Sequence, residues 1–357
     1  MVKIARNILI CIVLGLALEA CHPYLRHVPV AGETAPVGSS GDAADDMAVY
    51  VDLEDGQKSI LVGTDKQRGL ELYDLEGRLL QSFPLGRINN VDIARIAGSE
   101  RAWVGGSNRT DNTIALYFLQ KDPLELIPAS ASPAKVAMSE VYGFCWMAFA
   151  NEHYAVVSGT EGEIEIFRVS ERSDKTLEAI LWRQFKLPGQ TEGLVFDRIG
   201  GQLYLAEENG GIWRWDPAQP GQDAQLLVPL SEQPHFKADL EGLAIYYAQD
   251  QVRYLLVSSQ GNHRYGVFEI APNGLDYQGV FRTQATPKTD ASQETDGIEI
   301  VSCPLGSLFP SGILLVQDGK NTAPGQGRQH QNFKIIDWRD IAGAFSPPLE
   351  EKPDCNH

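Results

Sequence analysis

Residues 202–215 read Gln202-Leu-Tyr-Leu-Ala-Glu-Glu-Asn-Gly-Gly-Ile-Trp-Arg-Trp215. They show the sequence pattern that recurs along this chain. Two short runs of apolar and aromatic residues flank a loop of carboxylates, an asparagine and glycines. Alternation over four to eight residues between turn signals is typical of β-strands. The segment therefore predicts two short strands joined by an acidic turn.

Runs of this kind recur from Gly41 almost to the C-terminus, whereas helical periodicity is nearly absent except for one expected turn at 340–345. A unit of about 50 residues with about four strands is the signature of a propeller blade. The length of the chain allows about six such units. The pattern by itself leaves two all-β architectures open, a propeller and a large sandwich. The expected strands are 59–63, 70–74, 113–117, 155–158, 163–167, 202–206, 211–215, 254–258, 266–270 and 312–316.

Loops rich in carboxylates and carboxamides lie between these runs. Such loops would repel one another unless cations lay among them, and Ca²⁺ takes six to eight oxygen ligands of this kind. Asp, Asn and Gly at strand ends are also ordinary turn residues. Glutamate is a poor turn residue, so Glu192, Glu207 and Glu241 favour the metal interpretation. The loops are Gly41-Asp-Ala-Ala-Asp-Asp46, Asn89-Asn-Val-Asp92, Gln190-Thr-Glu-Gly193, Ala206-Glu-Glu-Asn209, Ala238-Asp-Leu-Glu-Gly242, Ser258-Ser-Gln-Gly-Asn262, Glu294-Thr-Asp-Gly297 and Gln317-Asp-Gly319.

The composition excludes some partners. The 357 residues carry a net charge of −17, and the 30 basic residues are scattered. Nucleic acid is therefore not an expected partner, because binding a phosphate backbone requires clustered Lys and Arg. Bound cations can nevertheless invert the local field of an acidic protein and let it bind a polyanion.

The N-terminus predicts export. Lys3 and Arg6 precede an apolar stretch from Ile8 to Leu18, which is shorter than the about 20 residues of a membrane span. Leu18-Glu-Ala-Cys21 resembles a bacterial lipobox, although Glu19 departs from its usual small or apolar residue. We expect a signal peptide over 1–20, a flexible Pro/Gly/Ser-rich tether over 21–40, a propeller over 41–346 and a C-terminal tail over 347–357.

The expected location is the periplasm or the periplasmic side of an outer membrane, with membrane contact only through a lipid on Cys21. A soluble secreted form and an uncleaved anchor are the alternatives. The expected state is a monomer.

Cysteine usage and hydrolase motifs exclude several kinds of chemistry. Cys145, Cys303 and Cys355 remain after the N-terminal region, with no CxxC spacing, so a zinc site is not indicated. A Cys303–Cys355 bridge stays open. No GxSxG elbow, HExxH helix or P-loop occurs. With no activated nucleophile in the sequence, we expect no covalent intermediate.

The loops and their surroundings resemble the β-propeller phytases, which are calcium-dependent enzymes that remove phosphate from myo-inositol hexakisphosphate. The resemblance implies a six-bladed β-propeller, with the two ends of the chain completing a shared blade. It covers nearly everything from Gly41 to Trp338. Besides the acidic loops, it rests on Thr64-Asp-Lys66, Ser107-Asn-Arg109, Glu140-Val-Tyr-Gly-Phe144, Leu203-Tyr-Leu-Ala-Glu-Glu208 and Gln331-Asn-Phe-Lys334.

The resemblance also implies a site and a reaction, that of a 3-phytase. Several Ca²⁺ ions would screen inositol polyphosphates or calcium-phytate and activate the attacking water. Tyr142, Glu192, Glu207, Lys66 and Arg109 would be the catalytic set, and Lys66, Arg68, Arg109 and Glu161 would contact substrate phosphate. The implied metal ligands are Asp46, Asn90, Asp92, Glu192, Glu207, Asp239, Glu241, Gln260 and Asp296.

The chain departs from the phytase pattern at several positions. Thr160 and Gln67 stand where lysines are common, and both changes remove positive charge that would hold a second phosphate, for which Arg68 is a candidate replacement. Glu299 replaces an Asp, and Met47 replaces a Pro. Two other functions stay open on the sequence: a calcium-dependent propeller hydrolase of the lactonase type, and a non-catalytic propeller that binds a glycan or protein. Lys66 and Arg109 argue against a lactonase, because a lactone has no phosphate for these cations to bind.

Overall fold

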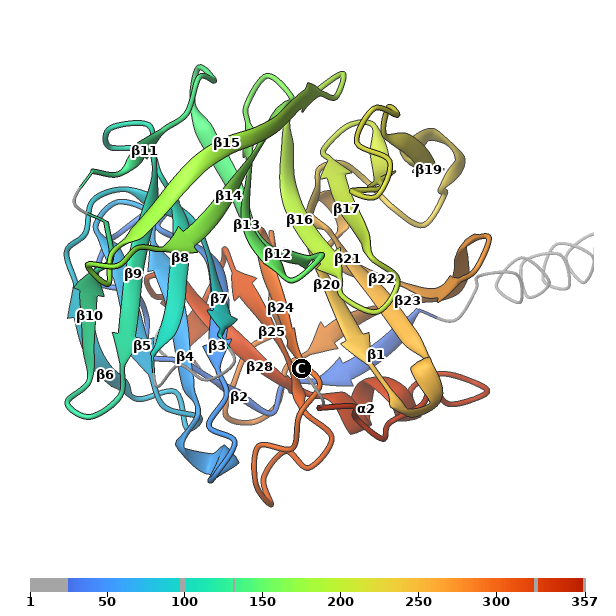
Figure 1. Ribbon diagram of the computed structural model, residues 1–357. Coiled ribbons are helices and arrows are strands. Elements are labelled where there is room, and N and C mark those ends of the chain that lie inside the picture. The colour runs from blue at the N-terminus through green and yellow to red at the C-terminus, as the bar shows by residue number, and fades with distance from the viewer. Residues whose placement is uncertain (1–24, 97–100, 131, 324–326, 356–357) are drawn as a thin grey trace, which may run out of the picture.

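The structure is a computed structural model, and it describes residues 25–96, 101–130, 132–323 and 327–355. The described residues form six sheets of four or five strands, arranged as blades around a central channel (Figure 1), and one small two-stranded sheet. The all-β, six-bladed propeller prediction is therefore confirmed.

Blades 1 to 3 follow the chain in order, each antiparallel from its inner to its outer strand. A two-residue strand, β11 (Ala134–Lys135), adds to β9 of blade 2. The strands are β3 (Ala44–Tyr50), β4 (Ile60–Asp65), β5 (Gly69–Tyr73) and β6 (Leu79–Phe83) in blade 1; β7 (Ile88–Arg95), β8 (Ala102–Asn108), β9 (Thr113–Gln120) and β10 (Glu125–Pro128) in blade 2; and β12 (Val141–Phe149), β13 (Glu152–Gly159), β14 (Glu163–Glu171) and β15 (Leu177–Lys186) in blade 3.

Blades 4 and 5 repeat the plan, and blade 6 differs in its outer strand. A small hairpin, β26 (Thr322–Ala323) and β27 (Gly327–Arg328), projects from blade 6. The strands are β16 (Thr191–Asp197), β17 (Gln202–Glu207), β18 (Gly211–Trp215) and β19 (Gln225–Pro229) in blade 4; β20 (Leu240–Tyr247), β21 (Arg253–Ser259), β22 (Arg264–Ala271) and β23 (Gly274–Gln284) in blade 5; and β24 (Ile298–Val301), β25 (Ile313–Asp318) and β28 (Asn332–Asp337) in blade 6.

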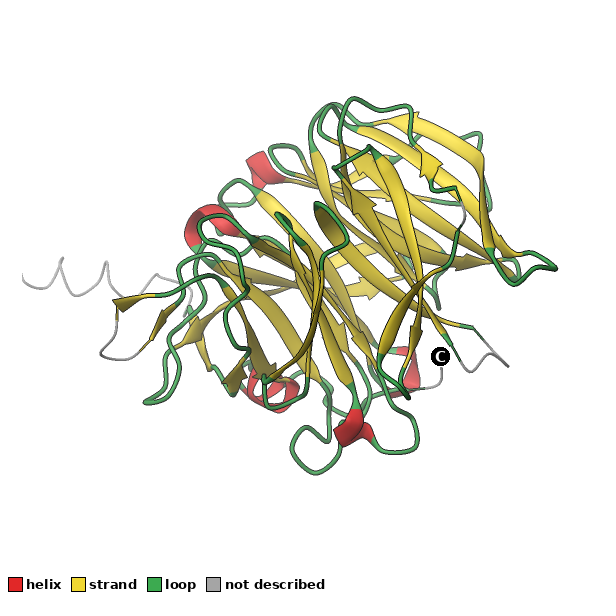
Figure 2. Cartoon of the chain, turned by 90° about the vertical axis from the view of Figure 1, so that its left-hand side faces the viewer, coloured by secondary structure: helices red, strands yellow, loops and turns green. Residues whose placement is uncertain are grey.

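Among the residues that the structure describes, helical structure is confined to short segments at the ends of strands, coloured red in Figure 2. The helix α2 (Trp338–Gly343) follows β28, where the sequence predicted one turn. Four single-turn 3-10 helices are η1 (Gly56–Lys58), η2 (Leu230–Glu232), η3 (Gln249–Gln251) and η4 (Gln260–Asn262). Within the described ranges, no helix is long and apolar enough to cross a membrane.

The apolar core is divided among the interfaces between blades. Six clusters of buried side chains each join two neighbouring blades. For example, one joins blades 3 and 4 through Val156 and Leu205, both 0% exposed. The inner strands also contact one another around the ring in the order β3, β7, β12, β16, β20, β24 and back to β3. Burial of each such aliphatic side chain contributes about 1.5–3 kcal/mol, so the ring is held mainly by contacts between blades.

The two ends of the chain close the ring. β2 (Gly32–Glu33) pairs with β28 as the outer strand of blade 6, as the resemblance implied. β1 (Arg26–Pro29) pairs in parallel with β23 of blade 5. A disulfide joins Cys303 to Cys355, so the bridge that the sequence left open is present.

The prediction of a flexible tether over residues 21–40 is wrong for the part that the structure describes. Val28, Val30 and Val37 are at most 2% exposed and pack in the core. Only Val28 of these valines lies in a strand, β1, and the Pro, Gly and Ser residues around all three suggested a tether instead of core residues. The predicted signal peptide and Cys21 lie outside the described residues.

Candidate functional site

A two-residue irregularity near the start of the inner strands builds the site. In blades 1 to 5 the register of the inner strand shifts by the same two positions, as in a β-bulge. A bulge turns side chains away from the regular alternation and is common next to active sites. The six equivalent pairs, with the pair just before β24 in blade 6, are Asp45-Asp46, Asn89-Asn90, Tyr142-Gly143, Glu192-Gly193, Glu241-Gly242 and Asp296-Gly297.

The glycines of these pairs let neighbouring blades meet closely. A Cβ on Gly143 would lie 2.1 Å from the carbonyl oxygen of Glu192, and one on Gly193 would lie 2.1 Å from that of Glu241. A Cβ on Gly242 would lie 3.0 Å from the carbonyl oxygen of Asp296. Each glycine thus receives the backbone of the acidic residue in the next blade. This contact holds the first residue of each pair beside the channel.

Three of these first residues, Tyr142, Glu241 and Asp296, line a cavity of about 600 Å³ at this end of the channel. Its wall is strongly acidic, and Lys66 lies among the carboxylates. Lys66 Nζ is 2.8 Å from an oxygen of Asp42, 2.8 Å from Asp45 and 3.6 Å from Asp296. Burial disfavours the charged lysine, but these carboxylates outweigh burial and raise its pKa. Lys66 is therefore a fixed positive charge.

Three buried glutamates form the most compact acidic group among the described residues. One carboxylate oxygen each from Glu192, Glu208 and Glu241 lies within 4.8 Å of the others. Burial, followed by the charge of nearby carboxylates, raises the pKa of Glu192 and Glu241 well above the usual value. The same two causes raise the pKa of Glu208 to about 7, with Asp239 as the neighbouring charge.

The glutamate group fits a hard cation. Glu241 Oε2 is buried and accepts no hydrogen bond within the described residues. A buried oxygen without a partner is costly, and three carboxylates this close repel one another. A divalent cation with oxygen ligands would remove both penalties. The residues present thus match the donor set that a metal such as Ca²⁺ requires.

Asn89 connects this group to Arg109. Asn89 Nδ2 donates to Glu192 Oε1 at 2.8 Å and to Asp45 Oδ2 at 3.1 Å, while its Oδ1 accepts from Arg109 at 3.0 Å. Arg109 also pairs with Glu140 at 2.7 Å and lies 5.7 Å above the ring of Tyr142. The charge of Glu192, with burial, raises the pKa of Tyr142, so this phenol stays protonated. The sequence-predicted residues Tyr142, Glu192 and Arg109 are thus brought together.

On the blade 5 and 6 side of the cavity, the predicted residues Asp239, Gln260 and Asp296 also meet. Gln260 Nε2 donates to Asp296 Oδ1 at 2.6 Å. Asp239 lines the same cavity and accepts from Asn209 at 3.3 Å. Burial, with the charge of Asp45 next, raises the pKa of Asp296 to about 8. These oxygens extend the acidic wall beyond the three glutamates.

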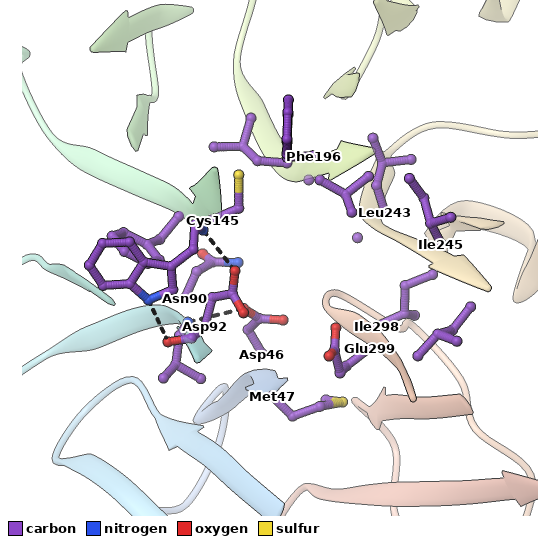
Figure 3. A pocket seen from close by; sticks show the side chains of 18 of the residues that line it. Asp46, Met47, Asn90, Asp92, Cys145, Phe196, Leu243, Ile245, Ile298 and Glu299 are labelled. Atoms are coloured by element: carbon purple, nitrogen blue, oxygen red, sulfur yellow. Dashed lines mark hydrogen bonds between the residues drawn. The ribbon is translucent and has the colours of Figure 1, made fainter. Parts of the chain in front are cut away.

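A second, smaller cavity of about 170 Å³ lies further inside the channel. The second residues of two pairs, Asp46 and Asn90, line it together with Asp92 and Glu299 (Figure 3). Asp46 accepts from Val91 N at 3.1 Å, and Asp92 accepts from Trp146 N at 2.7 Å. Figure 3 shows the carboxylates of Asp46 and Glu299 directed into the same space.

Burial is the main cause of the raised pKa values of the acids in this inner cavity. It raises the pKa of Asp92 to about 6, and burial with the charges of the other acids raises the pKa of Asp46 and Glu299 well above the usual range. The Cys145 thiol lines the same space, and its pKa is also raised by burial. Asn90 and Asp92, which the sequence predicted as metal ligands, therefore line the inner cavity and not the outer one, while Asn89 beside them bonds to Glu192 of the outer group.

Several predicted site residues lie outside both cavities. Glu207 accepts a hydrogen bond from Trp213 Nε1 at 2.8 Å, and its neighbour Glu208 takes the place among the glutamates. Arg68 and Glu161 are exposed and line neither cavity. The Arg68 guanidinium lies beside Gly38, so it does not replace the cation lost at Gln67.

Gln67 and Thr160, the two neutral residues that stand where lysines are common in phytases, make different contacts. Gln67 Nε2 donates to the carbonyl oxygens of Ser40 and Asp42, each at 2.9 Å, and so fixes the loop before β3. Thr160 is half-buried, and its N–H donates to Glu140 O at 3.3 Å. A lysine at this position would donate the same backbone bond, so nothing in the structure explains the threonine.

Sequence reasoning missed Asp45, Asn89 and Glu208. A signal for the first two was present, because the pairs that begin with Asp45, Asn89, Tyr142, Glu192, Glu241 and Asp296 recur about every 50 residues. Aligning the repeats on these pairs would have placed both residues at the channel mouth.

A six-bladed propeller with carboxylate and amide oxygens around one end of its channel defines a class of propeller proteins with an acidic channel mouth. Comparison with known proteins then narrows the class. The profile of the family described as Phytase matches residues 8–357, and a 3-phytase of Bacillus subtilis is 38% identical over 333 residues, which cover 91% of this chain and 86% of that protein. The chain belongs to the phytase family.

Solved structures with low sequence identity agree on the fold alone. A luciferin-regenerating enzyme superimposes with a TM-score of 0.53 at 10% identity, covering 85% of this chain and 95% of its own. An auxiliary nutrient binding protein from Bacteroides thetaiotaomicron gives 0.52 at 10% identity, covering 87% and 76%. Their different descriptions fit the rule that one fold carries many functions.

Proposed function

We propose that this protein is a calcium-dependent phosphomonoesterase that removes phosphate from myo-inositol hexakisphosphate. Membership of the phytase family supports the reaction and the substrate class. The observation that carries the calcium requirement is the group formed by Glu192, Glu208 and Glu241, whose buried carboxylates repel one another without a cation. An acidic cavity of this kind would also repel a polyanionic substrate.

The outer acids would hold Ca²⁺, with Asp45, Asp239 and Asp296 beside the three glutamates. When bound, the ions supply charge neutralisation for the phosphates and acidify water for attack on phosphorus. The inner cavity, with Asp46, Asn90, Asp92 and Glu299, is a separate candidate site whose buried carboxylates also require a counter-ion. Such an ion stabilises the ring rather than the reaction in this proposal.

Three side chains of the chain itself orient the reacting phosphate. Lys66 is protonated and fixed by Asp42, Asp45 and Asp296, so it presents a positive charge to the cavity. Arg109 is oriented by Glu140 and Asn89, which makes its guanidinium a directional donor. Tyr142 stays protonated and can donate a hydrogen bond to a phosphoryl oxygen. Together they stabilise the charge that develops on the transferring group.

The test is phosphate release from phytate by protein freed of metal with a chelator. We expect no release without metal, recovery with Ca²⁺, and poor recovery with Mg²⁺. Magnesium requires compact octahedral coordination and retains its water, whereas this cavity offers many carboxylates over a wide space. Full hydrolysis by metal-free protein would contradict the calcium requirement, and absence of hydrolysis under all three conditions would contradict the substrate.

For location, we propose a monomeric lipoprotein attached through Cys21 to the periplasmic side of the outer membrane. The lipobox-like Leu18-Glu-Ala-Cys21 supports this, as does His22, because an inner-membrane retention signal would have Asp there. Cys21→Ser should move the protein from the membrane fraction to the soluble fraction with unchanged specific activity. Wild-type protein found entirely in the soluble fraction would contradict the anchor.

A further inference from the structure

The loops at the far end of the channel, opposite the acidic mouth, carry exposed aliphatic side chains. The inner strands begin at the mouth, so the loops that follow β3, β16 and β24 lie at the far end. These loops contain Leu53, Ile199 and Leu308, which are 59%, 39% and 50% exposed. Large apolar side chains that gather on one face mark an interaction surface, whereas isolated ones need no explanation.

The loop of blade 6 that follows β24 contains no charged residue. It reads Ser302-Cys-Pro-Leu-Gly-Ser-Leu-Phe-Pro-Ser-Gly312, and its exposed residues are Pro304, Ser307, Leu308 and Pro310. The two ends of the channel therefore differ in polarity, and an uncharged loop tip can leave water without the cost of desolvating a charge. The wall of the outer cavity, by contrast, carries the acids Asp42, Glu208, Asp239, Glu241, Glu294 and Asp296.

The loop of blade 1 that carries Leu53 packs against this uncharged loop. Gln57 Nε2 donates to Ser307 Oγ at 3.4 Å. A Cβ on Gly56 would lie only 2.5 Å from the carbonyl oxygen of Pro304, so the two backbones touch. Leu53 and the uncharged loop tip therefore belong to one continuous face.

Hydrogen bonds hold both loops in place without covering the two leucines. Asp52 accepts from the N–H groups of Glu54 and Asp55, at 2.9 and 3.0 Å, and so closes the turn of blade 1. Arg339 Nη2 donates to Leu308 O at 3.2 Å and fixes the backbone of the loop tip in blade 6. The leucines are thus exposed on ordered turns.

The chain enters the propeller from the side of the far end. β1 is parallel to β23, and β23 runs from the far end toward the mouth. Leu25, the residue before β1, is therefore the part of this segment farthest from the mouth. Only residues 22–24 separate Leu25 from Cys21, so the extended chain between them reaches about 14 Å at most. A lipid on Cys21 would therefore keep the propeller against the membrane.

We propose that the far end of the channel is a membrane-contact surface, on which Leu53 and Leu308 enter the interfacial region of the bilayer that holds the lipid of Cys21. This inference rests on the proposed lipid anchor. Apolar side chains at such a surface add their buried area to the affinity that the lipid provides. Glu54 and Asp55 follow Leu53, so a zwitterionic lipid surface fits better than a strongly anionic one. The acidic mouth then faces the water, where a soluble polyphosphate reaches it.

Quenching of a fluorescent label tests this contact directly. The lipidated protein, with Ca²⁺ present, is placed in vesicles of phosphatidylethanolamine and phosphatidylglycerol whose acyl chains carry a nitroxide near the headgroup. A bimane label on Leu53→Cys or Leu308→Cys should lose about half of its fluorescence or more, because both positions lie in the interfacial region. The matched controls are Ile180→Cys, 49% exposed in the middle of the outer strand of blade 3, and Glu232→Cys, in η2 at the mouth. Neither control label should be quenched.

Anchor-free protein tests the surface without the lipid. Cys21→Ser should bind the same vesicles weakly in a flotation assay, and Leu53→Ser with Leu308→Ser in this background should lower the partition coefficient about tenfold. Ile180→Ser in the same background removes an equally exposed aliphatic side chain and should leave binding unchanged. Substitutions at exposed positions change stability little, so all of these variants should fold.

The outcomes separate the surface from the anchor. Equal vesicle binding by the two-leucine variant and by Ile180→Ser would overturn the inference, as would equal quenching at Leu308→Cys and Glu232→Cys. Leucine-dependent dimerisation in sedimentation, without vesicle binding, would assign the surface to a second copy of the chain and also overturn it. Wild-type protein in the soluble fraction, together with leucine-dependent vesicle binding by Cys21→Ser, would refute the anchor and leave the surface standing.

Discussion

Glu207 and Glu208 are adjacent in sequence but have different partners, and this difference makes them a matched pair for mutation. Glu208→Gln removes one charge from the glutamate group. It should raise the Ca²⁺ concentration needed for half-maximal phosphate release at least about tenfold, because a charged ligand is lost. Glu207→Gln alters the acceptor of the Trp213 hydrogen bond and should cost about 1 kcal/mol of stability with activity retained.

Initial rates against Ca²⁺ concentration, with urea unfolding curves for both variants, check this prediction. A stronger calcium defect in Glu207→Gln than in Glu208→Gln would show that the two side chains exchange places when metal binds. Equal calcium defects would refute the distinction drawn from the structure.

The same two residues show what the sequence could not decide. Successive side chains of a strand point to opposite faces, so only one of the two can face the channel. β17 ends at Glu207, and beyond a strand end the alternation no longer predicts direction. By contrast, Tyr142, Glu192 and Glu241 could be predicted, because each precedes a glycine and a buried apolar run in its blade.

At the scale of strands, the bulges are the elements that build the site, and Gly193 tests them. Gly193→Ala would place a Cβ 2.1 Å from the carbonyl oxygen of Glu241, which is backbone and cannot rotate away. We expect a loss of unfolding free energy of about 1–3 kcal/mol, typical of overpacking, and reduced turnover because Glu192 and Glu241 are displaced. Chemical denaturation and phytate hydrolysis measure the two effects.

Gly343→Ala is the control for this substitution. Gly343 ends α2, and a Cβ there would meet no atom within 4 Å. Alanine should leave activity unchanged and stability equal or slightly higher, because it has the better helix propensity. Normal stability in Gly193→Ala would mean that the blades can separate at this contact without cost.

Strands were easier to predict than the irregularities within them. The predicted strands 202–206 and 211–215 match β17 and β18. Such strands can be predicted because alternating apolar and polar residues indicate which face of a strand is buried. A bulge is defined by the residues of the neighbouring strand to which an inner strand is hydrogen-bonded. A single sequence does not reveal this register. β2 has two residues and was missed, because its pairing with β28 comes from the far end of the chain.

For the whole molecule, closure of the ring depends on a buried charge cluster where the two ends meet. Lys334 is 0% exposed and contacts Glu33 of β2, Asp290 and Asp318, the last at 3.1 Å. Burial disfavours its charge, yet Asp318, Asp290 and Glu33 outweigh burial and raise its pKa. The ammonium therefore holds three segments from distant parts of the chain.

Lys334→Met should lower the free energy of unfolding by about 3–5 kcal/mol, because the buried carboxylate of Asp318 and the partly buried carboxylates of Glu33 and Asp290 lose their counter-charge. The midpoint of guanidinium unfolding, measured with Ca²⁺ present, checks this expectation. Lys58→Met is the control, because Lys58 pairs, among the described residues, with Asp55 alone and at an exposed site, and its loss should change stability by less than about 1 kcal/mol. Equal midpoints for the two variants would rule out the cluster as the ring closure.

The glycine contacts divide the blades into two kinds with different freedom to change over evolutionary time. Blades 3 to 6 share a glycine at the second pair position, so copies of these blades could replace one another without a steric conflict there. Blades 1 and 2 carry Asp46 and Asn90 instead, and these side chains occupy the inner cavity. Glycine at only these two positions would remove two oxygen-bearing side chains from the inner cavity while leaving Asp92, Glu299 and the outer acids in place. The inner chemistry therefore depends in part on blades 1 and 2 remaining unlike the other four.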